Sequence, residues 1–449
     1  MQRSWTLLLP LTMAAITLGL FPLPAQNPDV ALAELKSPDA NRRAKAAHNL
    51  GKFGDLSVIP PLVAALNDPS EKVRSEVILA LGAFRDPTSL KAIVGAIEDP
   101  DPDLRVLAIR VIVGYYTGDM PSVGFGGFWK NKYHRAKGLF VPDITRVDPG
   151  VNADPEVVTG LLTALEDQRA ARVAREAAKA LGILAVRPAV PELVKAAHAA
   201  DEDLAREALN SLGKIKDTSV GPQLMDLLDS PNREIVRDSA VTLGMLRTQD
   251  ALSRLQLMFE NDPDQKTREK ALEGLAYLGN RVSVPAFVKA LWSVDDSLRT
   301  SAAEGLARAA DPKTLPEIQK AISVERKADP KLAMEFALAA MGRKDHLSVM
   351  VDEVGSKLHG QVAQAYLREL TREPHSPSLL YPYLNHSDAA VRKGLCSVLM
   401  FTGDQTSLPE LERLSRGSDT DVATEALRAM RAIRARTSAT TPPGAGGKS

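Results

Sequence analysis

The residues with the clearest chemical character are crowded into one short stretch, GFGGFWKNKYHRAKGLF at residues 124–140. Aromatic side chains are interleaved there with Lys and Arg, and no Asp or Glu occurs between Met120 and Pro142. Rings can stack on a sugar face or an aromatic peptide, and cations can pair with an anionic polymer. The stretch therefore predicts a binding site, whose candidate residues include two tyrosines just before it: Tyr115, Tyr116, Phe125, Phe128, Trp129, Lys130, Lys132, Tyr133, His134, Arg135, Lys137 and Phe140.

A structural role explains the same composition. Large aromatic side chains are commonly buried, so these rings could instead pack against neighbouring helices and fill a gap while the charges face water. The two roles are compatible, because the base of a long loop can be packed while its tip stays exposed. The sequence leaves both interpretations open.

The rest of the chain contains no pattern typical of catalysis or metal binding. The seven His residues are scattered and lack the H-x-x-x-H spacing that would place two ligands on one helix face. Cys396 is the only cysteine, so it is expected to be a buried apolar residue, and the chain must fold without an internal disulfide. We therefore predict no catalytic residues, no metal and no cofactor.

Charge and the N-terminal segment restrict the possible partners. The 56 Lys plus Arg balance the 56 Asp plus Glu, which disfavours nucleic acid as a partner. Arg3 precedes an apolar run from Trp5 to Leu20, and small or turn-forming residues follow up to Ala25. Residues 1–25 thus predict a cleaved signal peptide, a periplasmic or secreted location and no membrane span after cleavage. An uncleaved membrane anchor is the alternative.

Arginine recurs at a fixed step of 31 residues along most of the chain. Such a period predicts one supersecondary unit stacked many times. The arginines could form a basic ladder for an anionic partner, but bonds that hold each unit to its own or the adjacent unit are the favoured interpretation. The members of this arginine ladder are Arg43, Arg74, Arg105, Arg175, Arg206, Arg237, Arg268, Arg299 and Arg392.

Each unit reads as a pair of helices. Val73, Val77 and Leu81 follow the i, i+4 spacing of one buried helix face, and a second helix begins near a proline. The step from Arg105 to Arg175 is 70 residues, so the chain either rebuilds one unit with eight extra residues or inserts a segment of 39. Gly, Pro and aromatic residues dominate this interruption, and the helical pattern fades near residue 113.

The segment DPSEKVRSEVILALGAFRDPTSLKAIVGAIED, residues 68–99, resembles a HEAT repeat of the short bacterial kind also found in phycobilin lyases. The same pattern runs from Ser37 to about Arg436, although Pro330 and Gln361 stand where Arg recurs elsewhere. The resemblance implies an all-α fold, a right-handed α-α superhelix with an extended concave surface. The expected organisation is a signal peptide at 1–25, repeats at 28–112, an irregular aromatic and basic insert at 113–153, repeats at 154–436 and a disordered tail at 437–449.

These features predict an exported, non-enzymatic scaffold that binds a protein or extended peptide on its concave surface, with the insert as a specificity element. One alternative is that the insert binds a carbohydrate or an anionic envelope polymer. A third hypothesis is an enzyme accessory, by analogy with the bilin lyases that use related repeats.

Overall fold

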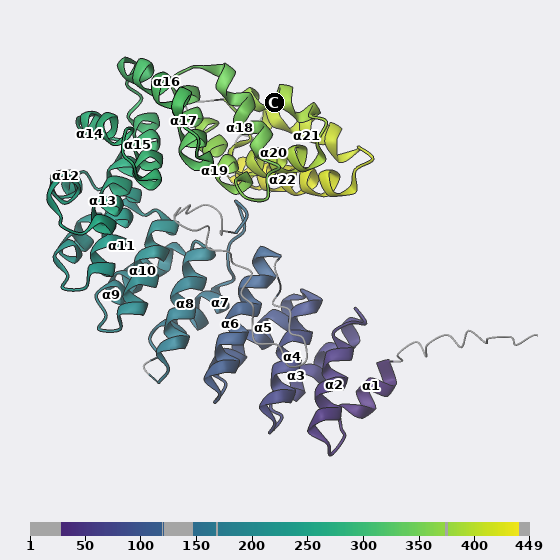
Figure 1. Cartoon of the computed structure of the whole chain (residues 1–449). Coiled ribbons are helices and arrows are strands. Elements are labelled where there is room, and N and C mark those ends of the chain that lie inside the picture. Colours follow the sequence, from purple (N-terminus) through teal and green to yellow (C-terminus); the bar gives the residue numbers. More distant parts are fainter. Residues whose placement is uncertain (1–27, 119, 121–146, 168, 373–375, 440–449) are drawn as a thin grey trace, which may run out of the picture. The chain divides into compact units, whose positions relative to one another are not determined.

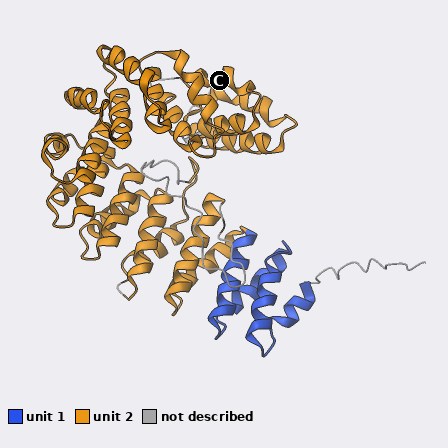
Figure 2. Cartoon of the chain, viewed as in Figure 1, with its two compact units in different colours: residues 1–84 blue, residues 85–449 orange. Residues whose placement is uncertain are grey.

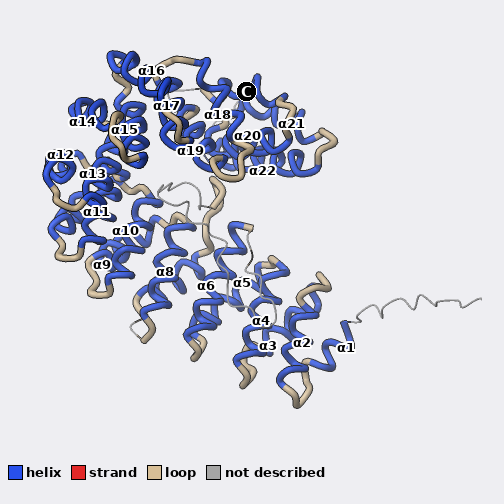
Figure 3. Tube along the Cα trace, in the orientation of Figure 1, coloured by secondary structure: helices blue, strands red, loops and turns tan. Residues whose placement is uncertain are grey.

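A computed structural model describes residues 28–118, 120, 147–167, 169–372 and 376–439 of the chain. Every regular element within these ranges is a helix (Figure 3). The chain divides into two compact units, residues 1–84 and residues 85–449 (Figure 2). The architecture is an all-α solenoid of helix pairs.

Unit 1 contains α1 (Pro28–Glu34), α2 (Ala40–Leu50), α3 (Ile59–Ala65) and α4 (Glu71–Phe84) (Figure 1). The longer helices α2 and α4 pack against each other, and α3 packs on α4. Leu50, Leu62 and Leu81 are fully buried in this contact. The side chain of Asp39 caps α2 by accepting a hydrogen bond from the Asn41 N–H, which satisfies a donor that the first turn leaves free.

In unit 2 the helices form two layers, and the layer that carries the arginine ladder lies on the inner side of the curve (Figure 1). Helices of this inner layer pack closely on one another, whereas helices of the outer layer mainly contact the inner layer. The inner layer comprises α6 (Pro102–Thr117), α8 (Ala171–Ile183), α10 (Glu202–Ile215), α11 (Arg233–Met245), α13 (Gln265–Leu278), α15 (Asp296–Ala309), α17 (Ala328–Ala340), α19 (Gly360–Leu370), α20 (Ala389–Thr402) and α22 (Thr420–Ala439). The outer layer comprises α5 (Pro87–Gly95), α7 (Pro155–Leu165), α9 (Val190–Ala197), the 3-10 helix η5 (Thr218–Asp229), α12 (Leu252–Asn261), α14 (Val284–Ala290), α16 (Leu315–Val324), α18 (Leu347–Glu353), the 3-10 helix η10 (Pro377–Asn385) and α21 (Leu408–Ser415).

The interruption lies inside a single repeat. Helix α5 contacts α7, and α6 contacts α8, so both layers continue across the extra residues. The chain thus adds a segment of 39 residues between an inner helix and the following outer helix. Helix α6 also runs further than the sequence pattern indicates, to Thr117, and ends at Gly118 with φ +85°. Only glycine adopts this left-handed conformation without a steric penalty, so the helix stops there rather than near residue 113.

The single cysteine has a structural role in the core. Cys396 on α20 is fully buried, and burial raises the pKa of its thiol to about 12. At neutral pH the group is therefore a protonated apolar side chain rather than a reactive thiolate. No helix in the described part of the chain is long and apolar enough to cross a membrane.

Candidate functional site

Most members of the arginine ladder tie a helix to the loop that precedes it. The Nη1 group of Arg43 donates to the carbonyl of Ser37, six residues earlier, at 2.9 Å. The equivalent bond joins Arg299 to Ser293 at 2.9 Å. Donation to a carbonyl in place of water satisfies the acceptor at a buried or half-buried turn. The same bond, to the residue six positions earlier, is made by Arg74, Arg105, Arg268 and Arg392.

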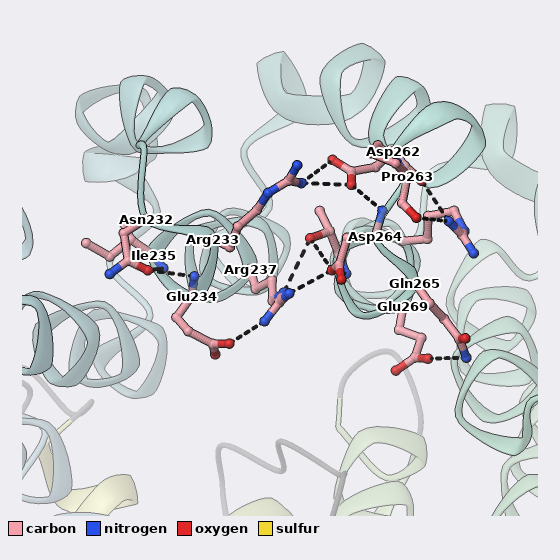
Figure 4. A network of polar contacts seen from close by, with 12 residues as sticks. Asn232, Arg233, Glu234, Ile235, Arg237, Asp262, Pro263, Asp264, Gln265 and Glu269 are labelled. Carbon is pink, nitrogen blue, oxygen red and sulfur yellow. Dashed lines mark hydrogen bonds and ion pairs between the residues drawn. The ribbon is translucent and has the colours of Figure 1, made fainter.

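Arg175, Arg206 and Arg237 point elsewhere, because their helices begin one residue earlier. The N-cap residue lies five positions before each of them, as Asn232 does for Arg237, whereas Asp264 lies four positions before Arg268. One residue of helix is a rotation of about 100°. These three guanidinium groups lose the loop carbonyl and bond carboxylates of the next repeat, as Figure 4 shows for Arg237 and Asp264. Arg43 and Arg299 also bond the next repeat, at Asp68 and Glu325, in addition to their loop carbonyls.

Acidification can test the hydrogen bond that joins Arg237 to Asp264 of the next repeat. Its Oδ2 accepts from the Thr267 hydroxyl at 2.8 Å, the Thr267 N–H at 2.7 Å and Arg237 at 2.7 Å. These bonds lower the pKa of Asp264 to about 2. Because the pKa is below its unfolded value of about 3.9, the stabilisation is present above that pH and is lost as pH falls towards 2.

We expect Asp264→Asn to lose less stability than the wild type between about pH 4 and pH 2, since the amide cannot be protonated there. Thermal melts of both proteins across this range measure the difference. The backbone amides of α13 should show smaller changes in hydrogen exchange on acidification in the variant than in the wild type. Parallel melting curves from pH 4 to pH 2 would contradict the assignment.

A continuous row of charged side chains crosses the inner layer of unit 2. Arg206 on α10 donates to Asp238 on α11 at 2.7 Å, and Lys270 on α13, whose charge also acts on Asp238, donates to Glu273 at 2.6 Å. Between about 31% and 37% of the side chains of Arg206, Asp238, Lys270 and Glu369 is exposed. We call this set the ionic strip; its members are Arg206, Asp238, Lys270, Glu273, Glu304, Arg308 and Glu369.

At the far end of the ionic strip Arg308 and Glu304 are nearly buried, Glu369 is partly exposed, and the contacts reach from α15 to α19. Arg308 on α15 donates to Glu369 on α19 through Nε at 2.8 Å and to Glu304 through Nη1 at 3.2 Å. The Tyr366 hydroxyl donates to Glu304 at 2.6 Å, and its ring stacks on Phe336 of α17 at 4.5 Å. The guanidinium of Arg308 also lies 4.6 Å from the centre of the Tyr277 ring. Hydrogen bonds and aromatic packing thus fix every charged member of this end.

Burial and pairing act in opposite directions on the charged groups of the ionic strip. Burial raises the pKa of Glu273, although Lys270 partly offsets this effect. Burial alone would lower the pKa of Arg308, but the Glu369 and Glu304 carboxylates outweigh it and raise that pKa well above its usual value. Burial and the Glu304 charge also raise the pKa of Tyr366 well above its usual value, so the hydroxyl stays protonated and able to donate.

The structure places two of the predicted insert residues on helix α6. Tyr115 and Tyr116 form an edge-to-face pair with ring centres 5.1 Å apart. The Tyr116 hydroxyl donates to the carboxylate of Asp154 at 2.5 Å and accepts from the Asp154 N–H at 2.9 Å. Tyr116 therefore anchors the end of the inserted segment to its start. The remaining candidates lie outside the described residues: Phe125, Phe128, Trp129, Lys130, Lys132, Tyr133, His134, Arg135, Lys137 and Phe140.

The end of the inserted segment also joins two distant parts of unit 2. The Val147 N–H donates to the Ile183 carbonyl at the end of α8, at 3.0 Å. Asp148 receives two bonds from Arg428 on α22, one of them 2.7 Å from Nη2. Gly150 has φ +87°, and a Cβ there would lie 3.0 Å from the Cβ of Ala435 on the same helix. Residues 147–150 thus connect α8 to α22. Arg428 on α22 lies 280 residues from Asp148 along the chain.

Comparison with protein families agrees with the helix-pair architecture. A family model described as HEAT repeats matches residues 28–112, 158–244, 190–276 and 252–339, which together cover more than half of the chain. The chain belongs to the HEAT-repeat family. No curated protein matches this HEAT-repeat protein.

Three solved structures illustrate what the HEAT-repeat protein is similar to. An engineered protein shares 18% identity over 91% of this chain and 98% of its own, with a TM-score of 0.38. The protein YibA of Escherichia coli shares 15% identity over 69% of this chain and 99% of its own, with a TM-score of 0.39. The complex of CpcE and CpcF of phycocyanin lyase from a Nostoc species shares 16% identity over 71% and 96%, with a TM-score of 0.25.

Sequence reasoning missed the ionic strip, although a signal for it was present. The strip members Glu273 and Glu304 recur at the 31-residue step together with Glu335, and all three lie on inner helices and are buried. Charged residues at buried, periodic positions indicate a polar network, because a charge is seldom buried without a partner. Within the described ranges, no group of three or more His, Cys, Asp or Glu side chains is arranged to hold a metal ion.

Proposed function

We propose that this HEAT-repeat protein is an exported, non-enzymatic scaffold that binds a protein segment or extended peptide along the inner layer of unit 2. The ionic strip is the observation that carries this proposal. Its partly exposed members alternate in charge from Arg206 to Asp238 to Lys270. An extended peptide presents backbone acceptors and donors in turn, so cations of the strip can bond its carbonyls and carboxylates its N–H groups.

The spacing of inner helices suits an extended chain. Packed helices lie about 8–10 Å apart, and an extended peptide rises about 3.3 Å per residue. A bound peptide would therefore meet the next inner helix about every third residue. Each repeat contributes one set of contacts, so affinity would accumulate with the number of repeats engaged.

The inserted segment is proposed as the specificity element. Its described ends support this role, since Tyr116, Asp148 and Asp154 fix its two ends to the inner layer of unit 2. A long segment anchored at both ends to a regular scaffold is the usual setting for selective binding. Binding of an envelope polymer by the same segment is the alternative; loss of binding to isolated cell-wall fractions in Trp129→Ala would favour it.

Affinity capture from the extracytoplasmic fraction tests the inner-layer proposal. We compare the wild type, the double variant Asp238→Ala with Lys270→Ala, and a matched double variant on outer helix α9, Glu192→Ala with Lys195→Ala. Both doubles remove one acid and one base, and Glu192 pairs with Lys195 at 2.7 Å. We expect the inner-layer double to lose the partner and the α9 double to keep it. Equal capture by all three proteins would overturn the proposed surface.

Export is tested separately. Cell fractionation of the full chain should place it outside the cytoplasm, with a mature N-terminus near Gln26, and removal of residues 1–25 should retain it inside. Retention of the full chain in the cytoplasm would contradict the proposed location.

A further inference from the structure

A groove runs between outer helices α5 and α7 of unit 2, on the layer opposite the ionic strip. Its volume is about 880 Å³. Val94, Ile97 and Ala164 supply an apolar floor, and Gly160 on α7 has no side chain to fill it. A Cβ at position 160 would already lie 3.1 Å from the Val94 Cγ1 atom and 3.2 Å from the Ile97 Cδ1 atom. Gly160 therefore allows α7 to pack closely on Val94 and Ile97 at the floor of the groove.

Carboxylates dominate the rim of this groove. Glu98, Glu156, Glu166 and Asp167 line it, against the single cation Arg169. Asp167 is already used inside the protein, because it pairs with Arg105 at 3.2 Å and both side chains are 5% exposed. Glu156 pairs with exposed Lys91 at 3.0 Å. Glu98 and Glu166 are exposed and form no salt bridge within the described part of the chain, so they remain available to an outside cation.

We propose that the α5–α7 groove docks a basic amphipathic helix of a partner protein. The acidic rim selects Lys and Arg at the edges of the ligand, and the apolar floor selects an aliphatic stripe between them. Both walls are helices whose backbone groups bond within the helix, so no strand edge exists to pair with an extended chain. A helical ligand needs no such edge, because its backbone N–H and C=O groups hydrogen-bond within the helix.

The α5–α7 groove and the ionic strip lie on different layers of unit 2 and would bind ligands of different conformation, a helix and an extended peptide. Substitution of Asp238 and Lys270 should therefore leave the affinity of the groove for a basic amphipathic helix unchanged. Conversely, blocking the groove should leave any peptide on the inner layer bound. The two binding proposals can therefore be tested independently of each other.

The test uses the full chain and a fluorescent probe, an acetylated helical peptide of about 14 residues with Leu and Lys on opposite faces. Fluorescence anisotropy is measured in salt of about 0.15 M, which screens long-range attraction. The groove variant is Glu98→Lys with Glu166→Lys. The matched control is Glu202→Lys with Glu260→Lys, which changes the net charge equally at two exposed acids that do not line the groove.

We expect the groove variant to raise the Kd of the probe at least about tenfold and the control to change it by less than about twofold. A second variant, Thr163→Trp, fills the groove without changing charge and should also weaken binding, with helix content checked by circular dichroism. An analogue of the probe with Glu in place of Lys should not bind. Equal losses in both charge variants, or unchanged binding in Thr163→Trp, would show general electrostatic attraction and overturn the proposal.

Discussion

Replacing Arg308 by Ala is expected to lower the free energy of unfolding of unit 2 by about 3–5 kcal/mol. The substitution removes the only cation that contacts both Glu304 and Glu369 among the described residues. The Glu304 side chain is 9% exposed, so its charge would remain buried without this cation, although the Tyr366 hydroxyl would still donate to it. A buried charge that loses its partner costs more than the original pair contributed.

Urea unfolding and hydrogen exchange of α15 and α19 measure this loss. The double variant Arg308→Ala with Glu304→Gln should recover part of it, because the stranded carboxylate becomes an amide that can still accept from Tyr366. Arg416→Ala is the matched control: Arg416 also bonds a glutamate, Glu412, but its side chain is 76% exposed. Its loss should be below about 1 kcal/mol. Equal effects of Arg308→Ala and Arg416→Ala would contradict the buried network.

The repeating part of the fold follows closely from local sequence. A step of 31 residues, an Asp or Asn cap and apolar residues at helical spacing are sufficient to place the inner helices, because each repeat needs only its neighbours. The local pattern predicts the wrong end for α6, because its apolar stripe weakens near residue 113 but the helix continues to Thr117 and is capped by Gly118. The conformation of a glycine ends this helix, and composition does not reveal it.

The contacts of the candidate site depend on how the repeats of unit 2 curve. The 31-residue sequence period does not show which residues of distant repeats come into contact. Tyr366 reaches Glu304, 62 residues away, because unit 2 brings α19 against α15 across Phe336 of α17. Arg428 reaches Asp148 from a helix 280 residues further along. A one-residue change in the start of a helix also removes Arg237 from the carbonyl six residues earlier, so that its partners are Glu234 and Asp264, the latter in the next repeat. Such partners require the three-dimensional arrangement.

Gly244→Ala is expected to destabilise unit 2 by about 1–3 kcal/mol or more, although Ala is the better helix former. Gly244 on α11 faces Gly274 on α13, and a Cβ at position 244 would lie 2.3 Å from the Gly274 carbonyl oxygen. A Cβ at position 274 would lie 2.3 Å from the Ala240 carbonyl oxygen. The obstacle is backbone in both directions, so no side-chain rotation can relieve it, and α11 and α13 must move apart.

Gly95→Ala is the matched control for this substitution. Gly95 ends α5 with φ −59°, and a Cβ there would meet nothing within 4 Å. The control should therefore be neutral or gain up to about 1 kcal/mol from helix propensity. Urea unfolding measures both variants, and hydrogen exchange should show the loss in Gly244→Ala first along α11 and α13. If the two variants were equally stable, these helices could not approach as closely as the structure shows, and the spacing of the ionic strip between Asp238 and Lys270 would have to be larger.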